Sequence, residues 1–171
     1  MTPFDLLELT ATIAAIGWAV RECRRARKAM FDGVYGCLTR SGLEANPPKA
    51  GSILFFDVDG MHDANERWGY EAVDSRIRAA IAQFRQSRGS SIVARWYSGD
   101  EVLAVVPQKD AVGAAERMLQ VFREQELGVT IGVCDISVGD WREAVRVASG
   151  LVQDAKRRGN RGQIYFAESA I

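Results

Sequence analysis

Two pairs of acidic residues are the part of this sequence best suited to chemistry. Asp57 and Asp59 stand at the end of a short apolar run, and Asp100 and Glu101 stand in a tight turn. Carboxylates at a strand end and at a hairpin tip can converge at one edge of a sheet, where they repel one another and need a cation. Oxygen ligands of this kind suit Mg²⁺ or Mn²⁺, with phosphate oxygens completing the coordination. Two such ions can align an attacking hydroxyl with a phosphorus atom, so the clusters indicate phosphoryl or nucleotidyl transfer.

Each acidic pair also has a simpler interpretation. Aspartates and glutamates are common at strand ends and turns, where they are solvated or cap helices. Either pair alone is more typical of such a structural role, and it is the occurrence of both at strand ends that favours a site.

The elements that must position these carboxylates alternate between strands and helices. Pro47 and Pro48 exclude a helix just before the first strand. Ser98, Gly99 and Asp100 separate two β-rich runs and predict a hairpin. The order predicts an α+β fold, a ferredoxin-like or palm-type mixed sheet with helices on one face. The predicted strands are 52–57, 91–97, 101–107, 128–134 and 163–166, and the predicted helices are 72–86, 111–124 and 141–158.

An amphipathic helix is predicted over residues 1–30, ahead of a domain at 31–171. Its apolar residues are spaced alternately three and four apart, which is a heptad seam. The helix could pack on its own domain, or it could pair in parallel with a second copy and make a homodimer. The seam residues are Leu6, Leu9, Ile13, Ile16, Val20, Cys23, Arg27 and Met30.

Composition suits one globular domain, with 171 residues of which 47% are hydrophobic and 26% charged. Three cysteines without CxxC spacing indicate reduced thiols and a cytoplasmic protein. The apolar stretch 6–20 is short for a membrane span and lacks the charge order of a signal peptide, although contact with a membrane surface stays an alternative. We expect no nucleic-acid partner, and no sensor domain in the roughly 30 residues before the domain.

Over roughly residues 29–166 the sequence resembles the GGDEF domain of bacterial diguanylate cyclases. Residues 32–40 resemble the opening D-x-L-T-G-L-x-N-R stretch, and residues 56–59 the F-D-x-D strand end. Residues 65–74 follow the spacing of the N-D-x-x-G-H-x-x-G-D region. Residues 98–102 (SGDEV) resemble the signature turn, and residues 155–159 the closing A-K-x-x-G. The matching segments lie in register, so they predict the fold of this family.

The resemblance implies a role for each candidate site residue. Metal ions would be held by Asp57, the carbonyl of Val58, Asp100 and Glu101, and Glu101 could instead activate the 3′-hydroxyl. Asp100 and Glu101 would thus be the catalytic residues. Substrate contacts would come from Asn65 and Asp74 on the guanine edge, and from His62, Lys156 and Arg161 on phosphate. Without the resemblance, Asn65 would be a capping or turn residue, and Asp74 and Lys156 solvated charges on helices.

Several positions depart from the family pattern. His62 replaces a lysine, Trp96 replaces an arginine with Arg95 displaced by one, and Ser98 replaces the first glycine of the signature. The order Asn160-Arg161 is also reversed. The R-x-x-D pair that binds inhibitory product in many members corresponds to Gly89 and Ile92, so we expect no product inhibition centred on nearby Arg88.

Three functions are therefore weighed. The first is an enzyme that condenses two GTP into cyclic di-GMP with Mg²⁺ or Mn²⁺, in a homodimer of facing sites. The second is a related cyclic-nucleotide synthase with other base specificity, using ATP, as in the palm of CRISPR-type polymerases. The third is a degenerate module that binds GTP and regulates a partner without turnover.

Overall fold

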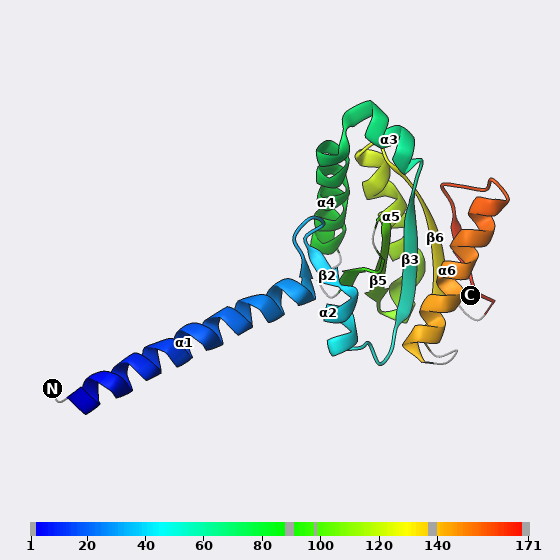
Figure 1. The fold of residues 1–171 in the computed structure, drawn as a ribbon. Coiled ribbons are helices and arrows are strands. Elements are labelled where there is room, and N and C mark those ends of the chain that lie inside the picture. The colour runs from blue at the N-terminus through cyan, green and yellow to red at the C-terminus, as the bar shows by residue number, and fades with distance from the viewer. Residues whose placement is uncertain (1–2, 88–90, 98, 137–139, 169–171) are drawn as a thin grey trace.

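The computed structural model describes residues 3–87, 91–97, 99–136 and 140–168, with the side chains of 3–9, 11 and 27 left out. A long helix leads into an α+β domain (Figure 1). The helices are α1 (Pro3–Met30), α2 (Arg40–Ala45), α3 (Met61–Trp68), α4 (Tyr70–Ser87), α5 (Ala111–Glu124) and α6 (Trp141–Arg157), with a 3₁₀ turn η1 at Gln108–Asp110. The strands are β1 (Phe31–Asp32), β2 (Cys37–Thr39), β3 (Ser52–Asp59), β4 (Ile92–Arg95), β5 (Glu101–Val106), β6 (Gly128–Asp135) and β7 (Ile164–Phe166).

One mixed sheet runs in the order β1-β2-β4-β5-β3-β6-β7. Its centre is antiparallel throughout, because β3 pairs with both β5 and β6, and β4 pairs with β5. Strands β3 and β4 are joined through α3 and α4 with β5 inserted between them, which is the split βαβ arrangement. The predicted ferredoxin-like, palm-type sheet and the predicted hairpin of β4 and β5 are confirmed.

Helices cover both faces of the sheet, so the expectation of helices on one face is wrong. On one face, α4 and α5 bury Ile77, Phe84 and Phe122 against alternate residues of the central strands. On the other, α6 buries Trp141 and Val152 against the residues between them. Strands that are buried on both faces do not alternate between apolar and polar residues, so the sequence pattern did not show which face the helices cover.

Helix α6 lies unusually close to strand β6. A Cβ atom built on Gly132 would lie 2.0 Å from the carbonyl oxygen of Ala148 in the helix. Only glycine fits at this crossing, and the close contact fixes the position of α6 and hence of Lys156 near its C-terminal end.

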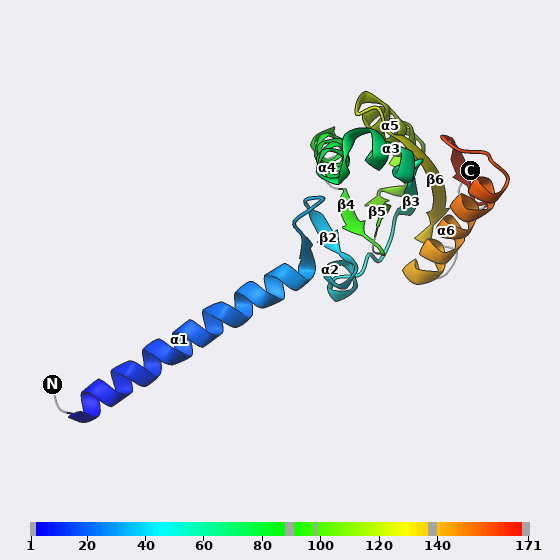
Figure 2. The same ribbon diagram turned by 45° about the horizontal axis from the view of Figure 1, so that its top comes forward.

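Helix α1 projects away from the domain and meets it only at its C-terminal end (Figures 1 and 2). There α2 packs so closely that a Cβ on Gly42 would lie 2.2 Å from the carbonyl oxygen of Met30. Along the helix Ile13, Ile16 and Val20 are 60%, 58% and 46% exposed. In the structure these three seam residues therefore do not pack on the domain. Within the described residues, no helix has the length and apolar character needed to cross a membrane.

Candidate active site

The two acidic pairs meet at one end of the central strands. Asp57, near the end of β3, is the register partner of Glu101, the first residue of β5. The signature turn that ends at Asp100 therefore lies beside the end of β3. The antiparallel pairing of the end of β3 with the start of β5 thus brings together two acidic pairs that lie far apart in the chain.

Asp57 and Asp100 lie close enough for the negative charge of Asp100 to act on the carboxyl group of Asp57. Burial raises the pKa of Asp57 to about 6, helped by the negative charge of Asp100 and opposed by Lys156. The pKa of Glu101 is also raised, first by burial and then by Asp57. Desolvated carboxylates that repel one another favour either a proton or a cation among them.

Lys156 supplies the positive charge nearest to these acids. Its Nζ lies 2.5 Å from Asp57 Oδ1 and 3.4 Å from Asp59 Oδ1, and it donates to the carbonyl oxygen of Val58 at 3.1 Å. The ammonium group thus occupies the place among the oxygens where a cation is expected. In the structure Lys156 is bound to predicted metal ligands, while its predicted contact with triphosphate stays a prediction.

Asp59 makes hydrogen bonds with Thr130 and Gly162, on β6 and in the loop after α6. Its carboxylate accepts from Thr130 Oγ1 at 2.9 and 3.0 Å and from the backbone N–H of Gly162 at 3.0 Å. Asp59 thus ties the loop after α6 to the sheet. This loop carries Arg161, which is exposed.

The donor set fits a hard divalent cation. It consists of the carboxylates of Asp57 and Asp100 and the carbonyl oxygen of Val58, all oxygen atoms, as Mg²⁺ and Mn²⁺ prefer. Within the described residues, no three acidic, histidine or cysteine side chains converge to hold a metal by themselves. An ion here would rely on the backbone carbonyl and on outside oxygens such as those of phosphate.

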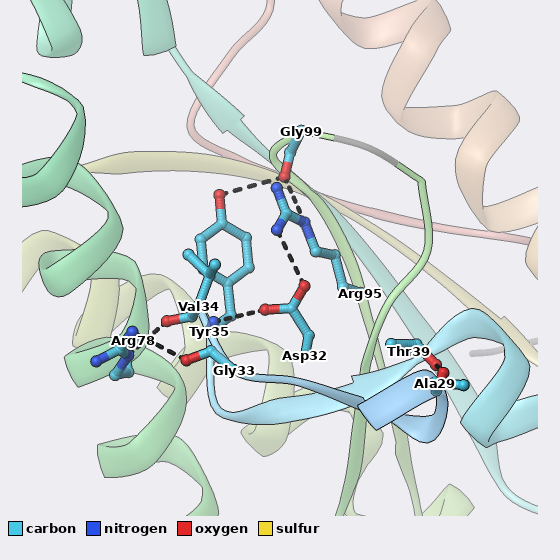
Figure 3. A network of polar contacts seen from close by, with 9 residues as sticks. All are labelled: Ala29, Asp32, Gly33, Val34, Tyr35, Thr39, Arg78, Arg95 and Gly99. Carbon is cyan, nitrogen blue, oxygen red and sulfur yellow. Dashed lines mark hydrogen bonds and ion pairs between the residues drawn. The ribbon is translucent and has the colours of Figure 1, made fainter. Parts of the chain in front are cut away.

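The signature turn is held by residues that sequence reasoning did not assign to the site. The carbonyl oxygen of Gly99 accepts from Tyr35 Oη at 3.2 Å and from Arg95 Nε at 3.0 Å (Figure 3). Arg95 also pairs with Asp32 at 3.0 Å, and its guanidinium group stacks on the Tyr35 ring at 4.2 Å. Two features of the sequence pointed toward these residues. Asp32 belongs to the opening motif, and Arg95 stands one position before the place of the family's arginine.

Two predicted base-reading residues lie on α3 and α4. Asn65 carries a buried side-chain oxygen, Oδ1, which has no hydrogen-bond partner in the described structure. An unpaired buried acceptor costs free energy, which a bound ligand donor would offset. Asp74 is half-buried and lies near enough to Tyr35 to raise the pKa of its hydroxyl, although burial is the larger cause.

The structure does not bring His62 to the carboxylates. The side chain is 82% exposed on α3 and lies 3.3 Å from Glu66 Oε1 one turn along the same helix. Trp96 is buried instead of lining a polar site, in an edge contact with Trp141 at 5.8 Å and under the Arg40 guanidinium at 4.5 Å. Neither position therefore carries the lysine or arginine of the family pattern.

Some predictions lie outside the described residues. These are the substitution at Ser98 and the absence of product inhibition around Arg88 and Gly89. Ile92, the second position of that missing pair, begins β4 and is partly exposed.

The palm-type sheet with carboxylates gathered at one end is the arrangement that the sequence resemblance predicted. Residues 38–161 match the family described as "Diguanylate cyclase, GGDEF domain", and the chain belongs to this family. A curated relative, diguanylate cyclase DosC of Escherichia coli strain K12, is 28% identical over 131 residues, covering 68% of this chain. The chain spans only 28% of the length of DosC.

Solved structures agree on the fold. The coiled coil and GGDEF domain of DgcB from Caulobacter crescentus, in complex with c-di-GMP, superimposes with a TM-score of 0.73 at 16% identity, covering 95% of this chain and 97% of that one. A microbial GGDEF domain studied for its interaction with cyclic di-GMP gives a TM-score of 0.69 at 27% identity, covering 81% and 99%. The first of these structures contains a coiled coil in addition to its GGDEF domain.

Proposed function

We propose that this chain is a nucleotidyl cyclase that condenses two GTP into cyclic di-GMP with release of pyrophosphate, using Mg²⁺ or Mn²⁺. The observation that carries the proposal is the meeting of Asp57, Asp100 and the Val58 carbonyl around a position now held by the Lys156 ammonium. A cluster of acids at a sheet edge costs stability through repulsion unless a cation is bound there.

Each residue has a place in the proposed reaction. Asp57, Asp100 and the Val58 carbonyl would hold the metal, which would draw charge from the phosphoryl oxygens and lower the pKa of the attacking 3′-hydroxyl. Glu101 has a raised pKa and lies in the register pair with Asp57, so it is placed to accept the hydroxyl proton or to bind a further ion. Lys156 would turn from Asp57 to the incoming triphosphate, exchanging one anionic partner for another.

Asn65 and Asp74 support GTP over ATP as the substrate. A carboxylate accepts well from the N1–H and N2–H₂ donors of guanine, whereas adenine presents a different edge. The unpaired Oδ1 of Asn65 offers a further acceptor for a donor on the base. Equal amounts of ATP and GTP in one reaction, followed by mass spectrometry of the products, separate cyclic di-GMP from adenine-containing cyclic dinucleotides.

The test of turnover is incubation of the purified protein with GTP and either Mg²⁺ or Mn²⁺. Cyclic di-GMP should form with the wild type and not with Asp100→Ala. Absence of product from both would contradict the proposal. Saturable GTP binding without product would then favour the regulatory module, which the exposed His62 and the buried Trp96 support.

We also propose that two chains pair through α1, because each domain would hold one GTP and the reaction joins two. Exposed Ile13, Ile16 and Val20 follow the heptad seam. Light scattering should show a dimer that Ile16→Lys disrupts and Trp18→Lys, outside the seam, does not. Mild oxidation should link two chains through Cys23, which is exposed on the seam, whereas Cys37 and Cys134 are buried. A monomeric wild type would contradict the pairing.

The cytoplasmic location stays a prediction from the cysteines.

A further inference from the structure

The carbonyl group of Gly99 is held from two sides directly before Asp100. Tyr35 Oη donates to it at 3.2 Å, and Arg95 Nε donates at 3.0 Å (Figure 3). Gly99 has a φ of +122°, a backbone conformation that residues with side chains rarely adopt. Contacts from outside the turn help to hold it in this conformation. The two donors supply such contacts at Gly99, directly before the predicted metal ligand Asp100.

Tyr35 is itself fixed by groups that do not belong to the signature turn. Its side chain is 1% exposed, and its backbone N–H donates to Asp32 Oδ1 at 2.8 Å. The Arg95 guanidinium stacks on the ring. The hydroxyl group therefore stands on a rigid support and reaches Gly99 from a segment 64 residues away in the chain.

Two arginines of α4 hold the loop that carries Tyr35. Arg78 donates to the carbonyl oxygens of Val34 and Gly33, and Arg85 donates to that of Gly36 at 3.1 Å. These contacts lie on both sides of Tyr35 along the backbone. They keep the tyrosine in place without any contribution from the turn that it supports.

Tyr35 also departs from the family pattern. The opening motif that the sequence resembles has threonine at this position, and the signature is preceded by arginine where Trp96 stands here. Trp96 is buried against Trp141 and Arg40, so it gives no polar support to the turn. Tyr35 and Arg95 are the two side chains that donate to the Gly99 carbonyl among the described residues.

We propose that Tyr35 is a positioning residue for Asp100, whose hydroxyl fixes the signature turn so that the Asp100 carboxylate faces Asp57. The inference rests on the proposed function in that Asp100 is taken to bind the metal. Tyr35 would touch neither metal nor nucleotide, and would act through the backbone of Gly99. The competing interpretation is a core tyrosine whose hydroxyl only satisfies its own hydrogen bond on burial.

The variant Tyr35→Phe separates the two interpretations, because it removes the hydroxyl and keeps the ring under Arg95. A matched control is Ser149→Ala, which also removes one hydroxyl bonded to a backbone carbonyl, that of Arg146 at 3.0 Å on α6. Both variants should lower the melting temperature slightly. Only Tyr35→Phe should weaken Mn²⁺ binding measured by calorimetry, by about three- to tenfold, the effect of one hydrogen bond. It should also lower kcat more than it changes KM for GTP.

A metal-free readout keeps this test separate from that of the proposed function. The backbone N–H of Trp96 donates to the Glu101 carbonyl at 2.9 Å across the turn, so its hydrogen exchange reports turn opening. Tyr35→Phe should speed this exchange about three- to tenfold in metal-free protein, and Ser149→Ala should not. Unchanged exchange and unchanged Mn²⁺ affinity in Tyr35→Phe would overturn the inference. Faster exchange in Tyr35→Phe, together with a wild type that makes no product, would leave Tyr35 as the support of the turn and reject only the cyclase.

Discussion

Two aspartates at opposite ends of the sheet show how differently a buried carboxylate can be accommodated. Asp135 ends β6 and is 2% exposed. Its two oxygens accept from Ser52 Oγ and from Gln108 Nε2, the latter at 2.5 Å. Asp57 lies near the end of the neighbouring strand β3, at the other end of the sheet, and is close to a second acid, Asp100, with Lys156 as its counter-charge. Asp135 is satisfied by neutral donors, whereas Asp57 is paired with an ammonium group and is proposed to bind a metal ion.

The largest difference between the two ends should appear in turnover. Asp57→Asn removes an anionic metal ligand, so it should lower the rate of cyclic product formation on the order of a thousandfold. Asp135→Asn should leave the rate within about twofold, because the hydrogen bonds that it disturbs lie at the far end of the sheet from the acidic pairs. Initial rates by chromatography measure both. Equal losses in the two variants would show that the carboxylates are not functionally distinct.

The free energy of unfolding should be more sensitive to a substitution at Asp135 than to one at Asp57, the opposite of the order expected for turnover. Asp135→Ala leaves the buried Ser52 hydroxyl and the Gln108 amide without their acceptor, which should cost about 1–3 kcal/mol of unfolding free energy. Asp57→Asn relieves repulsion with Asp100 and should leave the metal-free protein as stable as the wild type, or more so. Urea denaturation without divalent ions provides the measurement. A large loss in Asp57→Asn would mean that its pairing with Lys156 outweighs the repulsion.

The pH dependence of metal binding sharpens the contrast further. The pKa of Asp57 rises from 3.8 to about 6 in the folded metal-free protein. Its contribution to folding is therefore full below about pH 4 and is lost as the pH rises through about 6, where the carboxylate ionises. Mg²⁺ binds the ionised form, so the gain in melting temperature on adding Mg²⁺ should be larger at pH 7.5 than at pH 5, by roughly 2–4 °C for each kcal/mol of linkage.

Thermal scans of Asp57→Asn serve as the control for this pH effect. With no carboxylate at position 57, the gain from Mg²⁺ should be small at both pH values. A gain in the wild type that does not depend on pH would place the metal away from Asp57.

The smallest expected effect concerns Lys156, whose ammonium sits among the predicted ligands. Lys156→Met should tighten binding of Mg²⁺ alone by about two- to fivefold, because a competing charge is removed. The same change should weaken binding of GTP. Arg157→Met is a matched control, since Arg157 is exposed and pairs with Asp154 on the same helix. Weaker binding of Mg²⁺ alone would indicate that Lys156 holds the carboxylates in place.

The sequence predicted the elements that carry strong hydrophobic patterns. The runs ending at Asp57 and starting at Glu101 are almost entirely apolar, so their strands and the hairpin between 95 and 101 were predictable. Helix α5 was predicted at its observed bounds, Ala111–Glu124. Strands β1 and β2, with two and three residues, are too short to show a pattern, and neither was predicted.

The support of the site was less accessible to sequence reasoning. Asp32 and Arg95 meet across 63 residues through the parallel pairing of β2 with β4, which depends on those short strands. Lys156 reaches the Val58 carbonyl across 98 residues, and that contact depends on how α6 lies on the sheet. His62 was assigned by its place in the motif, but its position on α3 exposes it. Such contacts follow from tertiary packing, which local patterns do not encode.

The length of α1 sets a limit on how the domain can be controlled. With 28 residues at about 1.5 Å of rise per residue, the helix extends roughly 42 Å, more than the diameter of a small domain. A molecule that bound its far end could not touch the nucleotide. It could act on the site only through the helix, either by changing the proposed pairing of two chains or by rotating the end of the helix, which leads directly into Asp32 and the loop that supports Gly99.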